Sequence, residues 1–112
     1  MSETSLTKAI AEAINSIPGC YVWKNNVGRR GNKAFGKKGS ADITGIMHGG
    51  RRVEFEVKLP KNNHFEPGQL AFIERMKLLG ACAGVVRSVD DAVLSIKVAI
   101  AQHRGLQRKL SP

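Results

Sequence analysis

Three charged residues, Asp42, Glu56 and Lys58, have the types and the spacing that metal-assisted chemistry requires. Asp42 lies near the start of an apolar run over residues 41–47, and the other two end a second run over residues 51–58. Two glycines in the short connection predict that the runs pair as a hairpin. Side chains alternate along a strand, so Glu56 and Lys58 project from one face, about 7 Å apart.

Two carboxylates on paired strands can hold one hard cation through oxygen ligands, and Mg²⁺ favours such a site. The metal serves as a Lewis acid, and the lysine beside it can offset charge that builds on a phosphate. These residues therefore equip a protein for phosphodiester hydrolysis. A less specific interpretation stays open, because a Glu-x-Glu-x-Lys pattern is usual on the solvated outer face of a strand and an Asp after Gly-Ser-Ala is usual in a turn.

Two further residues favour the catalytic interpretation. Glu3 lies on the apolar stripe of a predicted first helix, so its carboxylate points toward the sheet, where it could reach a metal through water. Gln69 lies on the apolar stripe of a later predicted helix, although a polar residue at a helix start is an equally good explanation.

Hydrophobic periodicity predicts the elements that must position these residues. They are a helix over 2–17, a strand over 21–23, a loop over 24–39, strands over 41–47 and 51–58, a helix over about 67–79, a strand over 81–87 and a last helix to about residue 101. The order α-β-β-β-α-β-α indicates an α/β fold, with a mixed central sheet flanked by helices. The chain after Gln102 is expected to be a frayed tail.

Composition bounds the classes of protein. The 112 residues suit one domain, residues 1–112, with a core over about 3–100 and a basic tail over 102–112. A formal net charge of +9 favours a polyanionic partner, most often nucleic acid. The longest apolar run, 78–86, is too short to cross a membrane, and no signal-peptide pattern is present, so we expect a cytoplasmic protein without a membrane partner. Two separated cysteines and three scattered histidines argue against a zinc site.

The predicted loop over 24–39 is the most basic part of the chain. It holds six cations and no acid, and we expect all six to contact the DNA backbone: Lys24, Arg29, Arg30, Lys33, Lys37 and Lys38. Residues 31–38 nearly spell a phosphate-binding loop, but Lys38 replaces the hydroxyl residue and a strand follows instead of a helix. No nucleotide cofactor is therefore expected.

Tyr21 and Trp23 share one face of the first predicted strand. Packing in the core is the favoured role for them, and stacking on an unpaired base is the alternative.

The ordered motifs resemble the VRR-NUC (virus-type replication-repair nuclease) family of the PD-(D/E)xK nuclease superfamily. The resemblance covers about residues 3–100, with alanine at position 41, where the family often has proline. The matching pieces are Glu3 in an N-terminal helix, the Gly-Arg-Arg-Gly loop at 28–31, Lys-Gly-Ser-Ala-Asp at 38–42, Glu-Val-Lys at 56–58, and Gln69 ahead of a helix that ends in Leu79-Gly80.

The resemblance implies a PD-(D/E)xK core and an active site that depends on Mg²⁺ or Mn²⁺. It implies Asp42 and Glu56 as direct metal ligands, the backbone carbonyl of Val57 as a further ligand and Lys58 as the catalytic lysine. Glu3, acting on the metal through water, and Gln69 would be supporting active-site residues.

The sequence thus predicts a metal-dependent endonuclease that hydrolyses DNA, selects branched structures such as Holliday junctions, and serves in replication, repair or recombination. We expect a homodimer, because a single small domain offers little surface to hold branched DNA, and a location in the cytoplasm of a bacterial cell or a phage-infected host. The alternative is a non-catalytic, basic DNA-binding module of the same fold. A ribonuclease or RNA-binding role is weaker, because no RNA-binding motif is present.

Overall fold

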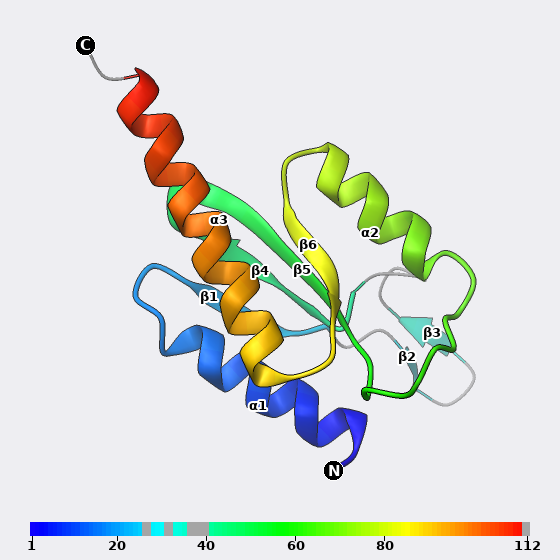
Figure 1. Ribbon diagram of the computed structural model, residues 1–112. Helices are drawn as coiled ribbons and strands as arrows, with labels where there is room; N and C mark the ends of the chain where they lie inside the picture. The colour runs from blue at the N-terminus through cyan, green and yellow to red at the C-terminus, as the bar shows by residue number, and fades with distance from the viewer. Residues whose placement is uncertain (26–27, 31–32, 36–40, 111–112) are drawn as a thin grey trace.

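The computed structural model describes residues 1–25, 28–30, 33–35 and 41–110, and it shows an α/β arrangement (Figure 1). The helices are α1 (Glu3–Asn15), α2 (Gln69–Leu78) and α3 (Val89–Leu110), and a 3-10 turn, η1 (His48–Gly50), joins two strands. The strands are β1 (Tyr21–Lys24), β2 (Gly28–Arg30), β3 (Lys33–Phe35), β4 (Ile43–Met47), β5 (Arg51–Val57) and β6 (Cys82–Val86).

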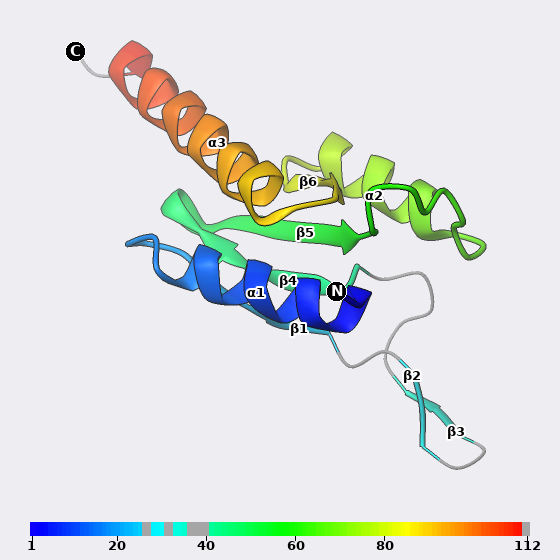
Figure 2. The ribbon, with the colours of Figure 1, turned by 60° about the horizontal axis from the view of Figure 1, so that its bottom comes forward.

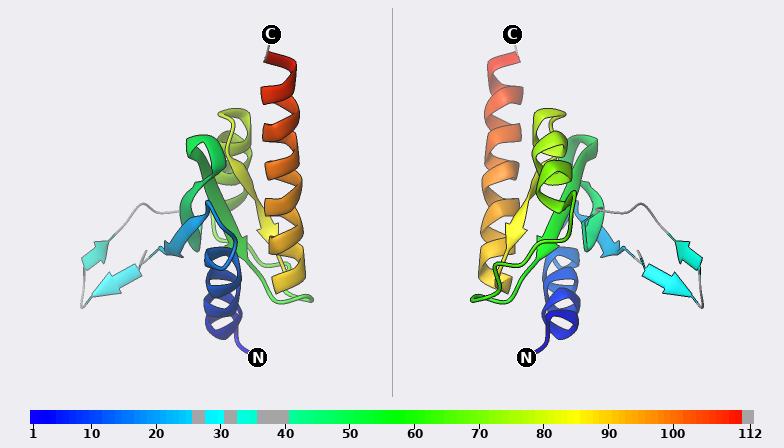
Figure 3. Two further views of the ribbon diagram at one scale, coloured as in Figure 1. Left: turned by 90° about the vertical axis from the view of Figure 1, so that its left-hand side faces the viewer. Right: turned by 90° about the vertical axis from the view of Figure 1, so that its right-hand side faces the viewer.

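Four strands form a mixed sheet in the order β1-β4-β5-β6. The pairs β1–β4 and β4–β5 are antiparallel, whereas β5 and β6 are parallel. A parallel pair needs a crossover connection, which α2 supplies. As a result α2 and α3 lie on opposite sides of β6 (Figure 3), and both faces of β5 are covered near its end. The predicted hairpin and the mixed sheet are confirmed.

The core lies between the sheet and the helices α1 and α3. The apolar stripe predicted for α1 is buried there, with Ile10 and Ile14 fully covered, and it packs with the inward side chains of β5, such as Phe55. The Ser2 side chain accepts a hydrogen bond from the Ser5 N–H and thereby caps α1. The alternation of apolar and polar residues thus decides which face of each element meets the core.

Two predictions about secondary structure were wrong. The segment 24–39 was expected to be a loop throughout, but β2 and β3 pair antiparallel as a small separate sheet, which projects from the body (Figure 2). The last helix was expected to end near residue 101 with a frayed tail, but α3 continues to Leu110. Glutamine, arginine, lysine and leucine dominate these last turns and are good helix formers, so a helix that has already started extends through them. No helix in the described part of the chain could cross a membrane.

Gly45 marks the closest approach of β1 and β4. A Cβ atom at this position would lie 2.2 Å from the Tyr21 carbonyl oxygen and 2.6 Å from the Val22 Cα. Both neighbours are backbone atoms that cannot turn aside as a flexible side chain could. The contact therefore requires glycine in β4.

We predict that Gly45→Ala lowers the free energy of unfolding by about 1–3 kcal/mol, because the added methyl group forces β1 away from β4. Gly84→Ala in β6 is the matched control, since a Cβ there meets nothing within 4 Å. Thermal and urea unfolding followed by circular dichroism measures both variants. Equal stability of the two variants would contradict the close approach.

Candidate active site

Asp42 and Glu56 lie side by side where β4 begins and β5 ends. The Asp42 carboxylate Oδ2 accepts a hydrogen bond from the Val57 N–H at 2.9 Å, and the Asp42 carbonyl accepts one from the Asn25 N–H at 2.8 Å. Ile43 pairs with Phe55 in the hairpin register, which sets Asp42 opposite Glu56. The structure therefore brings together the two carboxylates that the sequence predicted as a pair.

The Glu56 carboxyl group is held in a position that disfavours its charge. The residue is 2% exposed, and burial is the largest of the causes that raise its pKa to about 9. The adjacent Asp42 carboxylate raises the pKa further, because it can accept the proton of a neutral Glu56 and because its negative charge opposes a second one, and the charge of Lys58 lowers it. Without a cation, the pair therefore retains a proton at neutral pH.

One oxygen of this pair lacks a protein donor. Oε1 of Glu56 accepts a hydrogen bond from Gln69 Nε2 at 2.8 Å, whereas Oε2 is buried and has no hydrogen-bond partner. A buried acceptor without a partner costs about 1–3 kcal/mol. A divalent cation between the two carboxylates would satisfy it, so these residues fit the metal that the sequence predicted.

The remaining ligands of such a cation would have to be neutral or water oxygens. Among the described residues, no group of three or more His, Cys, Asp or Glu side chains could hold a metal ion. Mg²⁺ accepts a site with two carboxylates, because it usually keeps several waters. The carbonyl of Val57 and water-mediated contact with Glu3 remain predictions.

Lys58 follows Glu56 on the same face of the sheet, as predicted. It is buried, with 6% of its surface exposed, and its N–H donates to the Val86 carbonyl at 3.1 Å. Its ammonium group lies 5.0 Å from the centre of the Phe65 ring, within the range of a cation–π contact. The lysine therefore has a fixed position beside the carboxylates, with its charge close enough to act on Glu56.

Gln69 begins α2 and connects this helix to the site. Its Nε2 donates to Glu56, and its Oε1 accepts a hydrogen bond from the Glu66 N–H at 2.6 Å. Gly68, whose φ is 88°, is the residue that turns the chain into the helix. The side-chain amide thus fixes the orientation of the Glu56 carboxyl group, whereas a role for Gln69 in a metal site remains a prediction. Gln69 is also the first residue of α2, so the alternative of a polar residue at a helix start describes its position equally well.

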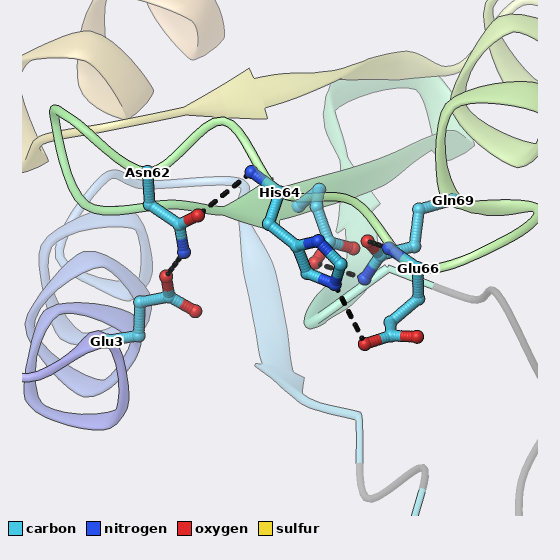
Figure 4. Close-up of polar contacts among 6 residues, drawn as sticks. Glu3, Asn62, His64, Glu66 and Gln69 are labelled. Carbon is cyan, nitrogen blue, oxygen red and sulfur yellow. Dashed lines mark hydrogen bonds and ion pairs between the residues drawn. The ribbon is translucent and has the colours of Figure 1, made fainter.

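Glu3 reaches the site region through a residue that the sequence did not indicate. Its Oε2 accepts a hydrogen bond from Asn62 Nδ2 at 2.6 Å, and its charge raises the pKa of Glu56 (Figure 4). Asn62 lies in the connection between β5 and α2, and its Oδ1 accepts from the His64 N–H at 2.9 Å. Glu3 is therefore near the pair, as expected, and is held by a loop rather than by the sheet.

Arg87 fixes that loop and was also missed. Its Nη1 donates to the carbonyls of Leu59 at 2.9 Å and Asn62 at 2.8 Å, and its Nη2 donates to Asn63 Oδ1 at 3.2 Å. These partners are mostly backbone carbonyls, which leave no pattern of residue types. The only feature of the sequence that could have indicated this role is the position of Arg87 at the end of the predicted strand.

The interpretation of residues 54–58 as a solvated face was wrong. Glu54 is 2% exposed. Its Oε1 accepts hydrogen bonds from Thr44 Oγ1 at 2.7 Å and from Arg52 Nη2 at 2.5 Å. The crossover helix α2 covers this side of the parallel pair, so the second face of β5 is buried as well.

The predicted DNA-binding cations are placed only in part. Lys24 is exposed at the end of β1. Arg29 and Arg30 belong to β2, and Lys33 belongs to β3. Lys37 and Lys38 fall outside the described residues. Contact of these cations with DNA remains a prediction.

The comparisons with known proteins bear on this arrangement. No protein-family model matches the sequence, and no curated protein matches it. Eight chains of solved structures do match. One of them, named as a VRR_NUC domain, is 26% identical with a TM-score of 0.60, over 85% of this chain and 94% of that chain.

This neighbour agrees with the mixed sheet, the flanking helices and the order of the elements found here. Its 26% identity extends over nearly the whole of the shorter chain. The chain is therefore similar in fold and in sequence to a solved VRR_NUC domain.

Proposed function

We propose that this protein is an endonuclease that depends on Mg²⁺ or Mn²⁺ and hydrolyses phosphodiester bonds in DNA. The match to a VRR_NUC domain supports a nuclease-type DNA-processing domain. The observation that carries the metal dependence is the buried pair of Asp42 and Glu56, in which one carboxylate oxygen has no donor and a lysine stands alongside.

Each residue of the site has a distinct task in this proposal. Asp42 and Glu56 would hold the cation, together with the carbonyl of Val57. The bound cation supplies Lewis-acid stabilisation of the charge that develops on the phosphate. Lys58, fixed against Phe65, places a second positive charge at the same phosphate, where little water competes with it. Gln69 holds Glu56 in the orientation that binds metal.

The proposal also covers the preferred DNA substrate and the number of copies of the chain that act together. A net charge of +9 on 112 residues supports binding to the DNA backbone. We propose that branched DNA, such as a four-way junction, is the preferred substrate and that two copies act together. A twofold dimer would present two equivalent sites to two strands of a junction that itself has twofold symmetry.

A non-catalytic DNA-binding module of the same fold is the second candidate, favoured by the charge alone. Such a module would bind DNA with the same dependence on salt, but it would not need a buried carboxylate pair beside a lysine. Cleavage assays separate the two candidates.

We predict that the protein cuts DNA when Mg²⁺ or Mn²⁺ is present and not when a chelator is added. Glu56→Gln and Lys58→Ala should each lower the rate of cleavage at least about a hundredfold, because the first removes a carboxylate that would hold the cation and the second removes a positive charge beside the phosphate. The assay uses labelled linear duplex, flap and four-way junction substrates. The exposed residues Glu12 and Lys61 supply matched controls, Glu12→Gln and Lys61→Ala.

If Glu56→Gln cleaves every substrate as well as the wild-type chain does, the active-site assignment is wrong. If the wild-type chain binds DNA in a salt-dependent way but cuts none of the substrates with either metal, the non-catalytic alternative holds.

The carboxylate pair also predicts how the metal-free chain responds to pH. The pKa of Glu56 is raised from 4.5 to about 9 in the folded state, so between these values the folded chain holds a proton that the unfolded chain has lost. Stability must therefore fall as pH rises through this window, by at most about 1.4 kcal/mol per pH unit. Glu56→Gln removes this loss, because its amide is neutral at every pH and can still donate to Asp42.

Thermal unfolding of the metal-free chain at pH 5.5 and pH 8 measures this difference, with Glu12→Gln as the control that behaves like wild type. Added Mg²⁺ should stabilise the wild-type chain more at pH 8 than at pH 5.5, because bound metal replaces the proton. Identical pH profiles for wild type and Glu56→Gln would refute the raised pKa.

A further inference from the structure

In the described part of the chain, no helix covers half of one sheet face beside the candidate active site. On the face that carries Glu56, α2 covers the β5–β6 side, while three large side chains of β1 and β4 remain accessible. Tyr21 is 68% exposed, Trp23 44% and Ile46 46%. The expectation that the two aromatic residues pack in the core was therefore wrong.

The two aromatic rings form a pair rather than separate exposed side chains. Tyr21 and Trp23 have ring centroids 5.5 Å apart, and their planes are tilted by 48°. Tyr21 pairs with Ile46 across the strands. The three side chains therefore make a continuous apolar surface at the β1 edge of the sheet.

The sheet register places this surface next to the carboxylate pair. Trp23 pairs with Thr44, two residues after Asp42. Diagonal neighbours of this kind lie about 7–8 Å apart, within reach of an aromatic side chain. The hydrogen bond from Thr44 Oγ1 to Glu54 Oε1 confirms that these rows share the face that carries Glu56.

A fixed positive charge flanks the same surface. Arg52 pairs with Ile46 in the register, and its Nη2 is bonded to Glu54 and Thr44. The buried Glu54 carboxylate thus anchors the guanidinium, while about half of the Arg52 side chain, 52%, stays exposed. A flat apolar surface beside an anchored cation complements a nucleotide, which joins a flat base to an anionic phosphate.

We propose that Tyr21 and Trp23 form a stacking platform for an unpaired nucleobase of the DNA substrate, with Arg52 contacting the adjoining phosphate. The proposal rests on the proposed nuclease function and specifies its substrate: DNA that has unpaired nucleotides beside the bond to be cut. Bases inside a duplex are stacked on one another, so only an unpaired or splayed base can occupy the platform.

Trp23 provides a direct test because it is the single tryptophan of the chain. In the Glu56→Gln background, where we expect cleavage to be slow, we titrate a short oligothymidylate and record tryptophan emission. Stacking of a thymine on Trp23 should quench the emission, and the quenching should reach a plateau as the oligothymidylate concentration rises. A hairpin duplex with the same number of nucleotides should quench it much less.

A second test replaces each aromatic ring by leucine, which cannot stack on a base but is still apolar. Trp23→Leu and Tyr21→Leu, in the same background, should weaken anisotropy-measured binding of the oligothymidylate about tenfold and change duplex binding less than about twofold. Leu106→Ala, at an exposed apolar residue of α3 outside this surface, is the control and should leave both affinities unchanged. Equal effects on the two DNA forms, or none on either, would overturn the platform.

A second copy of the chain at the open β1 edge is the competing occupant. Light scattering coupled to size exclusion decides this, because Trp23→Leu would then convert a dimer to a monomer, and that result would overturn the proposal. These experiments separate a failure of the nuclease proposal from a failure of the platform. If oligothymidylate quenches the emission but the wild-type chain cleaves no DNA, the nuclease proposal is wrong and the platform stands. Cleavage of flap DNA that is unchanged by Trp23→Leu rejects only the platform.

Discussion

The burial of a carboxyl pair at the end of β5 is the constraint on which the rest of this structure depends. Glu56 is almost wholly removed from solvent, and Asp42 faces it from the neighbouring strand. Such a pair is unfavourable in a protein core unless a proton or a cation neutralises it. The surrounding elements supply fixed donors to some of its oxygens and leave one oxygen open. This open oxygen makes the pair a candidate site for a cation.

The parallel pairing of β5 with β6 is what creates this environment. An antiparallel neighbour could follow β5 through a short turn and leave its second face in water. The parallel neighbour instead requires α2, which covers that face and delivers Gln69 to Glu56. The same topology brings Arg87, just beyond β6, to the loop that carries Asn62. The parallel direction of β6 relative to β5 thus brings most of the residues of the site together.

Much of this could be predicted from the sequence, and the limits have physical causes. Period-two alternation placed Glu56 and Lys58 on one face, and helical periodicity buried the correct stripe of α1. Alternation does not reveal which faces another element covers, so the burial of Glu54 and the exposure of Tyr21 and Trp23 depended on tertiary packing. Arg87 acts largely through backbone carbonyls, and Asn62 reaches Glu3 from an irregular loop, so no spacing of residue types reveals either role. The short strands β2 and β3 pair only with each other, and their glycine-rich, cationic sequence is typical of a loop.

The contacts of Arg87 have a consequence for the order in which the chain is made. During synthesis, Asp42 and Glu56 are made early, within the β4–β5 hairpin. Arg87, which holds the loop between β5 and α2, follows 31 positions after Glu56. Val57 also awaits Val86, its partner in β6. A nascent or truncated chain that ends before this point holds the acidic residues without the framework that aligns them. The framework of the candidate site is therefore complete only after β6 and Arg87 have been made.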